Sequence, residues 1–546
     1  MSIATTDALA VDRQTAPLYD AIIVGAGFSG LYQLHQLRDK LGLSALVLEA
    51  GDGVGGTWHW NRYPGARCDS ESYYYSYSFS KDLQEEWQWS ERYPEHYEIR
   101  RYLNHVADRF DLRRDIRLET RVQSARYDEA ANLWTITTEA GQVYNAQFFI
   151  TAVGCLSAAN IPNLKGLENF KGRWYHTGRW PREGVDFTGK RVGLIGTGST
   201  GIQAAPVLAE MAQHLTVFQR TANYSVPARN GKVSAEFQRE VKDNYEAIRQ
   251  KARSSINGHP FDIYDKSALD VSPEERLMRY EAAWELGGLR FRAVFSDLLR
   301  SKTANDTASE FIRDKIRSIV KDPATAAKLT PTDHPFATKR PPIDSNYFET
   351  FNRDNVALVD LKATPIIEVT EAGIRTSDGD IPLDIIVFAT GYDAMTGALL
   401  SIDIHGSDGH SLREDWAAGP RTYLGLQVVG YPNMFTITGP GSPSVLTNMP
   451  VAIEQHTEWV TACIRHMREH GLQRIETTQK ATDKWVDQVN DAAHATLLPL
   501  ANSSWYLGAN VPGKPRVFMP YAGGMAHYAK ICADVAKENY PGFVLS

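Results

Sequence analysis

Two copies of the glycine pattern GxGxxG place the strongest constraint on how this chain can fold. The first copy contains Gly25, Gly27 and Gly30 and follows the apolar segment 19–24, and the second spans 196–201. In a strand–turn–helix unit, the first glycine permits a tight turn, the second lets a pyrophosphate approach the backbone, and the third lets the helix pack against the strand. The repeated pattern therefore predicts an α/β protein with two Rossmann-like dinucleotide-binding domains.

The residue that ends the next apolar segment differs between the two copies. Glu49 lies nineteen residues after Gly30, where a carboxylate can accept hydrogen bonds from ribose hydroxyls, which suits FAD or NAD. Arg220 lies at the same offset after Gly201, where a guanidinium can bind a 2′-phosphate with two parallel hydrogen bonds. Two sites of opposite preference indicate a flavoprotein that binds FAD at the first site and is reduced by NADPH at the second.

A helical insertion is predicted between the second motif and the C-terminal half. Residues 234–329 carry no glycine motif, Ser272 and Pro273 begin a capping box, and Ile312 and Ile316 recur at helical spacing as core residues. Such an insertion could cover an active site.

The rest of the chain is expected to complete the two dinucleotide-binding domains. Apolar runs at 357–360 and 366–369 are predicted strands of the NADPH domain, and the buried run at 383–392 is predicted to return the chain to the FAD domain. The predicted division is an FAD domain from 1–160 and 383–546, an NADPH domain from 161–232 and 335–382, and a helical insertion from 233–334.

Composition excludes several classes of function. The chain has 546 residues, of which 43% are apolar and 23% charged, as expected for a globular enzyme of two or three domains. Its net charge of −7 gives no reason to propose nucleic acid or an anionic membrane as a partner, no apolar run is long enough to span a bilayer, and residues 1–18 show no secretory signal. Four widely spaced cysteines offer neither a CxxC pair nor a zinc site, and no metal is expected. We therefore expect free thiols and a cytoplasmic location.

A segment between the two glycine motifs is the most specific pattern in the chain. Phe170, Gly172, His176 and the pair Trp180-Pro181 fit FxGxxxHxxxWP, and on this basis the chain resembles the Baeyer–Villiger monooxygenases. From the residues alone, His176 would be a hydrogen-bonding hinge. The resemblance implies a similar role, as a conformational element between domains and not a proton-transfer base.

Further segments carry the same resemblance. Residues 55–69 are similar to the family pattern GGTWYWNRYPGxxxD, with His59 where tyrosine is usual, and Lys339-Arg340 corresponds to a Lys-Arg pair of the family. We expect His59 to alter packing or solvent access near the flavin. The likeness extends from about residue 20 to 543 and is strongest to the phenylacetone and steroid monooxygenase branch.

The resemblance implies the reaction and the site residues. NADPH and dioxygen would act through a flavin peroxide anion to convert a ketone to an ester or lactone, with sulfide oxidation as a side activity. Arg340 would hold the anion and polarise the carbonyl, because arginine stays protonated at working pH, and Asp69 would orient it. The loop near 500–515 would be mobile and fold Trp505 over the site.

The predicted cofactor contacts combine the glycine motifs with these segments. The expected FAD contacts are Gly25, Gly27, Ser29, Gly30, Glu49, Thr57, Trp58, Asp69, Tyr75 and Met449. The expected NADPH contacts are Arg67, Thr197, Gly198, Ser199, Thr200, Gly201, Gln203, Arg220, Thr221, Lys339, Arg340 and Trp505.

Alternative functions remain open at this point. A flavin monooxygenase that oxidises sulfur or nitrogen would use the same two nucleotide sites, although Trp180-Pro181 and Lys339-Arg340 argue against it. An uncoupled NADPH oxidase, a disulfide reductase and a non-enzymatic NADP(H) sensor are further alternatives, of which the reductase is disfavoured by the missing CxxC pair. The sequence names neither the ketone nor the oligomeric state, for which monomer and homodimer are both compatible.

Overall fold

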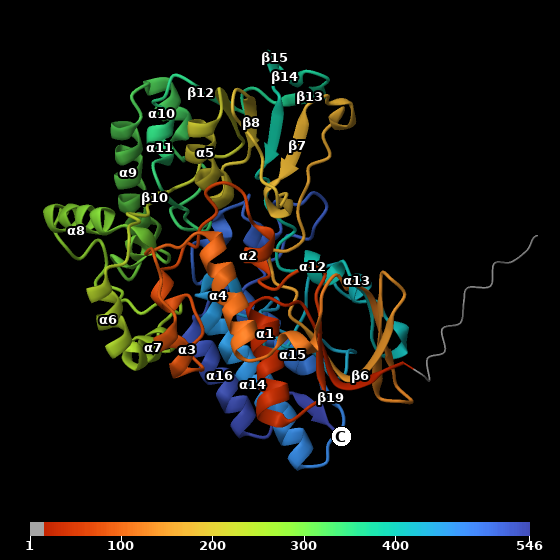
Figure 1. Cartoon of the computed structure of the whole chain (residues 1–546). Coiled ribbons are helices and arrows are strands. Elements are labelled where there is room, and N and C mark those ends of the chain that lie inside the picture. The colour runs from red at the N-terminus through yellow and green to blue at the C-terminus, as the bar shows by residue number, and fades with distance from the viewer. Residues whose placement is uncertain (1–15) are drawn as a thin grey trace, which may run out of the picture.

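A computed structural model describes residues 16–546 and places the two glycine motifs in two separate sheets (Figure 1). Most of the segment 1–18, where we expected no secretory signal, lies outside the described residues. The first sheet is eight-stranded, and β1 lies between β6 and β2 in parallel pairing. Its strands in spatial order are β17 (Asp403–His405), β4 (Val122–Asp128), β5 (Leu133–Thr138), β6 (Val143–Thr151), β1 (Leu18–Val24), β2 (Ala45–Leu48) and β3 (Ile116–Arg117), with β18 (Met434–Thr436) also paired to β6.

Helices cover the first sheet and bury its central strands. The last four residues of β1 and all of β2 are buried, as expected for parallel strands covered on both faces. Helix α1 (Phe28–His35) follows the first glycine turn and packs against α14 (Met449–Glu469), where Gln33 donates to the Thr461 hydroxyl at 3.2 Å. The other helices on this side are α2 (Thr57–Trp60), α3 (Lys81–Glu86), α4 (His96–Arg109), α15 (Gln479–His494) and α16 (Met525–Lys537).

The second sheet has five strands and lies at the opposite end of the molecule in Figure 1. All of its neighbouring strands pair in parallel, and α5 (Ser199–Met211) follows the second glycine turn. The strands in spatial order are β12 (Val356–Asp360), β9 (His214–Gln219), β8 (Arg191–Ile195), β16 (Ile385–Phe388) and β7 (Arg173–His176). Both sheets thus carry the predicted strand–turn–helix unit.

The structure corrects one strand assignment. Strand β16 lies within the second sheet, where Val387 pairs with both Tyr175 and Leu194, so the run at 383–392 does not return the chain to the first sheet. The prediction was wrong because a fully buried apolar strand fits the centre of either sheet equally well. The return comes later, with β17 and β18. The run at 366–369 forms a strand, as predicted, and this strand lies in a separate antiparallel sheet of β13 (Ile366–Thr370), β14 (Gly373–Thr376) and β15 (Gly379–Pro382).

The predicted helical insertion is confirmed as a group of helices. The hydroxyl of Ser272 accepts a hydrogen bond from the backbone N–H of Glu275 at 3.2 Å, as a capping residue does, and Ile312 and Ile316 are fully buried. The helices are α6 (Ala235–Asp243), α7 (Tyr245–Arg253), α8 (Pro273–Leu286), α9 (Lys302–Ile319) and α10 (Pro323–Leu329), and Figure 1 shows them together along one side of the molecule. The remaining short elements are β10 (Val226–Pro227), β11 (Ile343–Asp344), α11 (Tyr347–Thr350), α12 (Gly397–Leu400), α13 (Leu412–Asp415), β19 (Ile475–Thr477) and β20 (Phe543–Leu545).

Arg249 of α7 links the helical insertion to the half of the molecule that contains the first sheet. Its buried guanidinium donates to the carbonyl oxygens of Tyr74 and Ser76, both at 3.1 Å, and to the Ser76 hydroxyl at 2.7 Å. Arg253, one turn later, pairs with Glu454 of α14 at 3.2 Å. The boundaries of the domains themselves stay predictions.

Two glycines of the second turn should respond differently to substitution. A Cβ at Gly201 would lie 2.0 Å from the carbonyl oxygen of Gly196, whereas a Cβ at Gly198 would meet no atom within 4 Å. We expect Gly201→Ala to lower the thermal unfolding midpoint, since forced overpacking costs on the order of 1–3 kcal/mol. Gly198→Ala is the matched control and should leave that midpoint unchanged. Equal midpoints for both variants would contradict the packing role of Gly201.

Candidate active site

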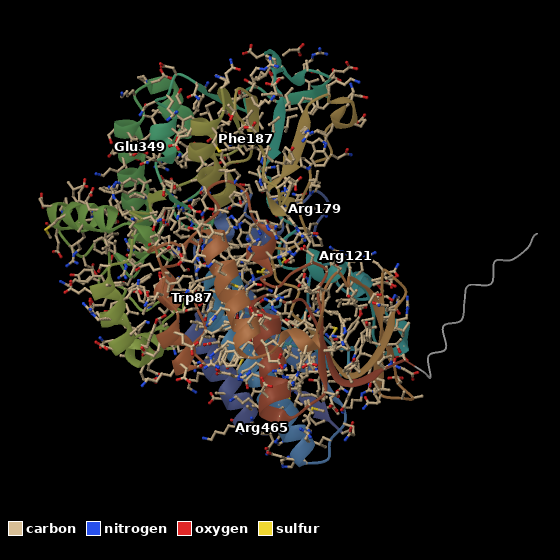
Figure 2. The ribbon with its side chains drawn as sticks, viewed as in Figure 1. Trp87, Arg121, Arg179, Phe187, Glu349 and Arg465 are labelled. Atoms are coloured by element: carbon tan, nitrogen blue, oxygen red, sulfur yellow. The ribbon has the colours of Figure 1, made fainter. Side chains whose placement is uncertain are left out.

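A deep groove with a cavity volume of about 1740 Å³ brings the two glycine turns together. Arg121 and Arg179, which Figure 2 labels where the two halves of the molecule meet, both line it. Gly30 and Gly201 do not line the groove. The predicted site residues that do are Gly25, Gly27, Ser29, Glu49, Thr57, Trp58, Arg67, Asp69, Tyr75, Thr197, Gly198, Ser199, Thr200, Gln203, Arg220, Thr221, Lys339, Arg340, Met449 and Trp505.

The first turn leaves the start of α1 open to the groove. Gly25 has a φ of +104°, which favours glycine, and no side chain caps the helix at Gly27. The uncapped N–H groups therefore remain free for an anion, and the missing Cβ at Gly27 keeps the approach clear. Gly30 serves packing instead, because a Cβ there would lie 1.8 Å from the carbonyl oxygen of Gly25.

Glu49 lies beside this turn and is buried. Its two carboxylate oxygens accept hydrogen bonds from the backbone N–H groups of Ala26 and Gly51, both at 2.7 Å. Burial raises the pKa of Glu49, and the two N–H groups oppose that rise. An ionised carboxylate has further lone pairs, so Glu49 can still accept hydrogen bonds from a ribose in the groove.

The second turn repeats this arrangement. Helix α5 starts after Gly198 with no side-chain cap, and the space around Gly198 is clear of other atoms within 4 Å of a Cβ. Thr197 donates its hydroxyl hydrogen to the carbonyl oxygen of Thr221 at 2.8 Å, which ties the turn to the end of β9. A second cradle for a pyrophosphate is thus built on the other sheet.

Two cations near the second turn, Arg220 and Lys339, form no ion pair in the described part of the chain. Neither Arg220 nor Lys339 forms an ion pair with any residue in 16–546, although both line the groove. Burial lowers the pKa of Lys339 to about 8, with Arg220 and Lys362 acting in the same direction and Asp333 against it. Two uncompensated cations side by side form a site suited to a phosphate dianion.

Arg340 and Asp69 form a bidentate ion pair at the groove. The guanidinium donates through Nε and Nη2 to the two carboxylate oxygens, each at 2.9 Å, and through Nη1 to the carbonyl oxygen of Val445 at 2.9 Å. Burial alone would lower the pKa of Arg340, but Asp69 outweighs it and raises this pKa above its ordinary value. The site therefore keeps a permanent cation in a fixed orientation.

Other predicted contacts have protein partners of their own. Arg67 pairs with Glu91 and, at 2.6 Å, with Glu95, so its guanidinium is already occupied. Gln203 accepts a hydrogen bond from the Tyr63 hydroxyl at 2.8 Å and donates to the carbonyl oxygen of Arg67 at 3.1 Å. Gln203 thereby joins α5 to the segment that leads to Asp69.

His176 is buried at the end of β7 and does not line the groove. Its Nδ1 accepts a hydrogen bond from the backbone N–H of Gly178 at 3.0 Å, and its ring lies edge-on to Tyr392 with 6.1 Å between centroids. Burial and the nearby Arg179 lower the pKa of His176 to about 4. A neutral, buried ring in such contacts fits the predicted structural role.

His59 is not among the residues that line the groove. Its Nε2 lies 2.9 Å from a carboxylate oxygen of Asp52, and the ring borders two smaller pockets. Trp58 and Trp60 line the groove while His59 does not, so the expectation that His59 alters packing or solvent access near the flavin stays a prediction.

One wall of the groove was not predicted from the sequence. Residues 152–164 follow β6 and line it, and the hydroxyl of Thr390 donates to the carbonyl oxygen of Asn160 at 2.6 Å. Asn510 then donates to the carbonyl oxygen of Tyr392 at 2.7 Å, which places the loop near 500–515 over this wall. The glycine at 154, directly after an apolar strand, was the available signal.

Comparisons with known proteins agree with this architecture. Residues 22–265 match the family model described as pyridine nucleotide-disulphide oxidoreductase. The chain is 45% identical to a Baeyer-Villiger monooxygenase of Pseudooceanicola batsensis and 44% identical to a cyclohexanone 1,2-monooxygenase of Acinetobacter, with 96% of each chain covered. A solved steroid monooxygenase bound to NADP superimposes with a TM-score of 0.92 at 52% identity, covering 97% of this chain and 99% of that one. The chain therefore belongs to the family of Baeyer–Villiger monooxygenases, which are flavoproteins with two dinucleotide-binding sites.

Proposed function

We propose that this chain is an FAD- and NADPH-dependent Baeyer–Villiger monooxygenase that converts ketones to esters or lactones with dioxygen. The observation that carries the proposal is the Arg340–Asp69 pair, which holds a permanent cation in the groove between two dinucleotide cradles. When bound, FAD accepts hydride from NADPH and activates dioxygen. The residues of this chain are proposed to bind the two cofactors, to orient the reacting groups and to stabilise the charge that develops on them.

Arg340 is proposed as the catalytic cation. Its guanidinium polarises the ketone carbonyl and stabilises the negative charge that develops on the reacting oxygens. Asp69 acts as a positioning residue, because both of its oxygens hold the guanidinium at 2.9 Å. The Val445 carbonyl fixes the third donor, so little reorganisation is needed during the reaction.

The two glycine turns differ in the dinucleotide that each is proposed to bind. The first turn with Glu49 suits FAD, since its acid can bind ribose hydroxyls. The second turn suits NADPH, since Arg220 and Lys339 lack any carboxylate partner among the described residues and can bind the 2′-phosphate with Thr221. Arg67 is the weakest of the proposed NADPH contacts, because two glutamates already hold it.

Conformational roles are proposed for two further elements. His176 contacts Tyr392, whose hydroxyl donates to the side-chain oxygen of Asn61 at the end of α2, and His176 would transmit movement through this chain of contacts. Trp505 belongs to the 500–515 loop and lines the groove. Lys514 of the same loop donates a hydrogen bond to the carbonyl oxygen of Ala394 at 2.7 Å and holds the loop in place. Opening of the loop would release Trp505 and admit the substrate.

The setting of the enzyme is also proposed. All four cysteines are buried and free, which suits a reducing compartment such as the cytoplasm. Within residues 16–546, the helices are too short or too polar to cross a membrane. Monomer and homodimer are both compatible with the proposal.

The function is tested by measuring NADPH consumption with small cyclic, aromatic, long-chain and steroid ketones and identifying the products. Ester or lactone formed in step with NADPH oxidation supports the proposal. Hydrogen peroxide release that no ketone suppresses would instead indicate an NADPH oxidase, and exclusive oxidation of sulfides or amines would indicate a heteroatom monooxygenase.

Replacement of the catalytic cation should separate NADPH oxidation from oxygen insertion. We expect Arg340→Ala to lower the rate of ester formation on the order of a hundred- to a thousandfold while FAD stays bound. NADPH consumption should continue with release of hydrogen peroxide. Arg340→Lys should restore little, because lysine cannot pair with Asp69 through a planar fork. Product analysis beside flavin absorbance measures both effects, and undiminished ester formation by Arg340→Ala would identify another residue as catalytic.

Coenzyme preference should depend on Arg220. Arg220→Ala removes one charge-assisted pair with the 2′-phosphate, which is worth roughly 1.5–3 kcal/mol, or about ten- to a hundredfold in affinity. NADH has no such phosphate and serves as the internal control, so its KM should stay nearly constant. Steady-state kinetics with both coenzymes checks this, and equal use of NADH and NADPH by the unmodified enzyme would refute the assignment.

Lys339 should make NADPH binding sensitive to alkaline pH. The pKa of Lys339 is lowered to about 8, so its ammonium is present below pH 8 and is lost as the pH rises. The bound 2′-phosphate raises this pKa, and we expect NADP⁺ affinity to fall above pH 8 by up to about tenfold per pH unit. Lys339→Met should bind NADP⁺ more weakly at pH 7 and without this decline. Calorimetric titration from pH 7 to 9.5 measures it, and an unchanged decline in the variant would assign the effect elsewhere.

A further inference from the structure

A second concave site, separate from the groove, lies between α2 and α4. Its cavity volume is about 710 Å³, and Trp87, labelled in Figure 2, forms part of its wall. Five of its lining residues are Arg62, Arg100, Arg101, Arg182 and His105. None of the predicted cofactor contacts lines this cavity, which we term the basic pocket.

The basic pocket contains more cations than its carboxylates can neutralise. Its two acidic side chains are Asp52 and Asp108. Asp52 is already bound to Arg182 and lies 2.9 Å from the His59 ring. Asp108 faces Arg113 at 2.5 Å, and Arg113 lies outside the pocket lining. Neither carboxylate is therefore available to the remaining arginines.

Three arginines of the basic pocket have no carboxylate partner within residues 16–546. Arg62 donates through Nε to the carbonyl oxygen of His59 at 2.6 Å, which leaves its charge uncompensated. Arg101 lies over the ring of Trp87 at 5.9 Å, and the Arg100 side chain forms no hydrogen bond or ion pair with a described residue. All three guanidinium groups thus keep free donors.

The electrostatic effect of this imbalance is visible in the neighbouring groups. Burial and then Arg100 lower the pKa of Arg62. Burial, Arg62 and Arg100 together lower the pKa of His59 to about 4, and the same three causes lower the pKa of His96 to about 4. Like charges placed this closely cost free energy unless an anion joins them.

We propose that the basic pocket binds a small multivalent anion of the phosphate or pyrophosphate class. The guanidinium groups that line the cavity come from two segments, Arg62 from just after α2 and Arg100 and Arg101 from α4, so one anion could accept hydrogen bonds from both. An anion with several oxygens and at least two charges matches this arrangement better than a single carboxylate. Trp87 and the two occupied aspartates bound the site, which limits the ligand to a small molecule.

The basic pocket has a structural connection to the groove. Its wall includes Asp52, Gly53 and Val54, and this segment follows Glu49 of the first cradle. A Cβ at Gly53 would lie 2.8 Å from the His59 ring, so loop and ring are in close contact. A bound anion would relieve the repulsion between Arg62 and Arg100 and thereby stabilise the loop beside the first cradle. The proposal does not depend on which reaction the enzyme catalyses.

Calorimetry on the FAD-loaded protein, saturated with NADP⁺ so that both dinucleotide sites are filled, tests the proposal. Pyrophosphate, inorganic phosphate and acetate are titrated at constant low ionic strength. We expect pyrophosphate to bind more tightly than phosphate, and acetate to give no saturable binding. The double variant Arg100→Gln, Arg101→Gln should weaken pyrophosphate binding at least tenfold, since charge-assisted hydrogen bonds are lost.

The matched control is Arg114→Gln, Arg117→Gln, which changes the net charge equally. Both residues are exposed and lie outside the pocket lining, so pyrophosphate affinity should stay as in the unmodified protein. FAD content and the thermal unfolding midpoint without anion establish that both variants fold, and Arg101→Gln alone, at an exposed position, is the reserve variant. Equal affinities for pyrophosphate and acetate, or equal weakening by both double variants, would overturn the proposal.

Discussion

The rest of the structure depends on two helix N-termini that open toward one groove. Each helix begins after a glycine turn, and no side chain of residues 16–546 caps its first N–H groups. Gly30 and Gly201 make this possible, because a Cβ at either position would collide with the carbonyl oxygen of its own turn. The sheets, the helices and the insertion therefore hold the two anion-binding helix N-termini at one groove.

The cations near these two helix N-termini differ in whether a carboxylate of the chain is paired with them. Where a cation must stay fixed, the chain supplies a carboxylate, as Asp69 does for Arg340. Where a ligand phosphate is expected, the cations form no ion pair with a described residue, as with Arg220 and Lys339. The basic pocket around Arg62 and Arg100 follows the second pattern, which is why uncompensated cations at a concave surface are informative about ligands.

Much of the fold and of the site could be predicted from local patterns. The two strand–turn–helix units, the helix cap at Ser272 and the buried isoleucines of α9 depend on neighbours within a few residues, and all were confirmed. Strand β16 was assigned to the wrong sheet, because an apolar strand buried on both faces carries no mark of which strands it will join. The wall at 152–164 was missed since its glycine lies outside a GxGxxG pattern.

The sequence by itself determined two dinucleotide-binding units, an acid at the first and a base at the second, and a helical insertion, because periodicity and turn chemistry are local properties. Only the tertiary structure decided which charges are compensated. Arg340 meets Asp69 across 271 residues, Arg67 is held by glutamates, and Arg220 forms no ion pair with a described residue. It also decided that Trp58 lines the groove while His59 does not. Such outcomes depend on how distant segments pack and on what burial excludes from water, and no local pattern encodes them.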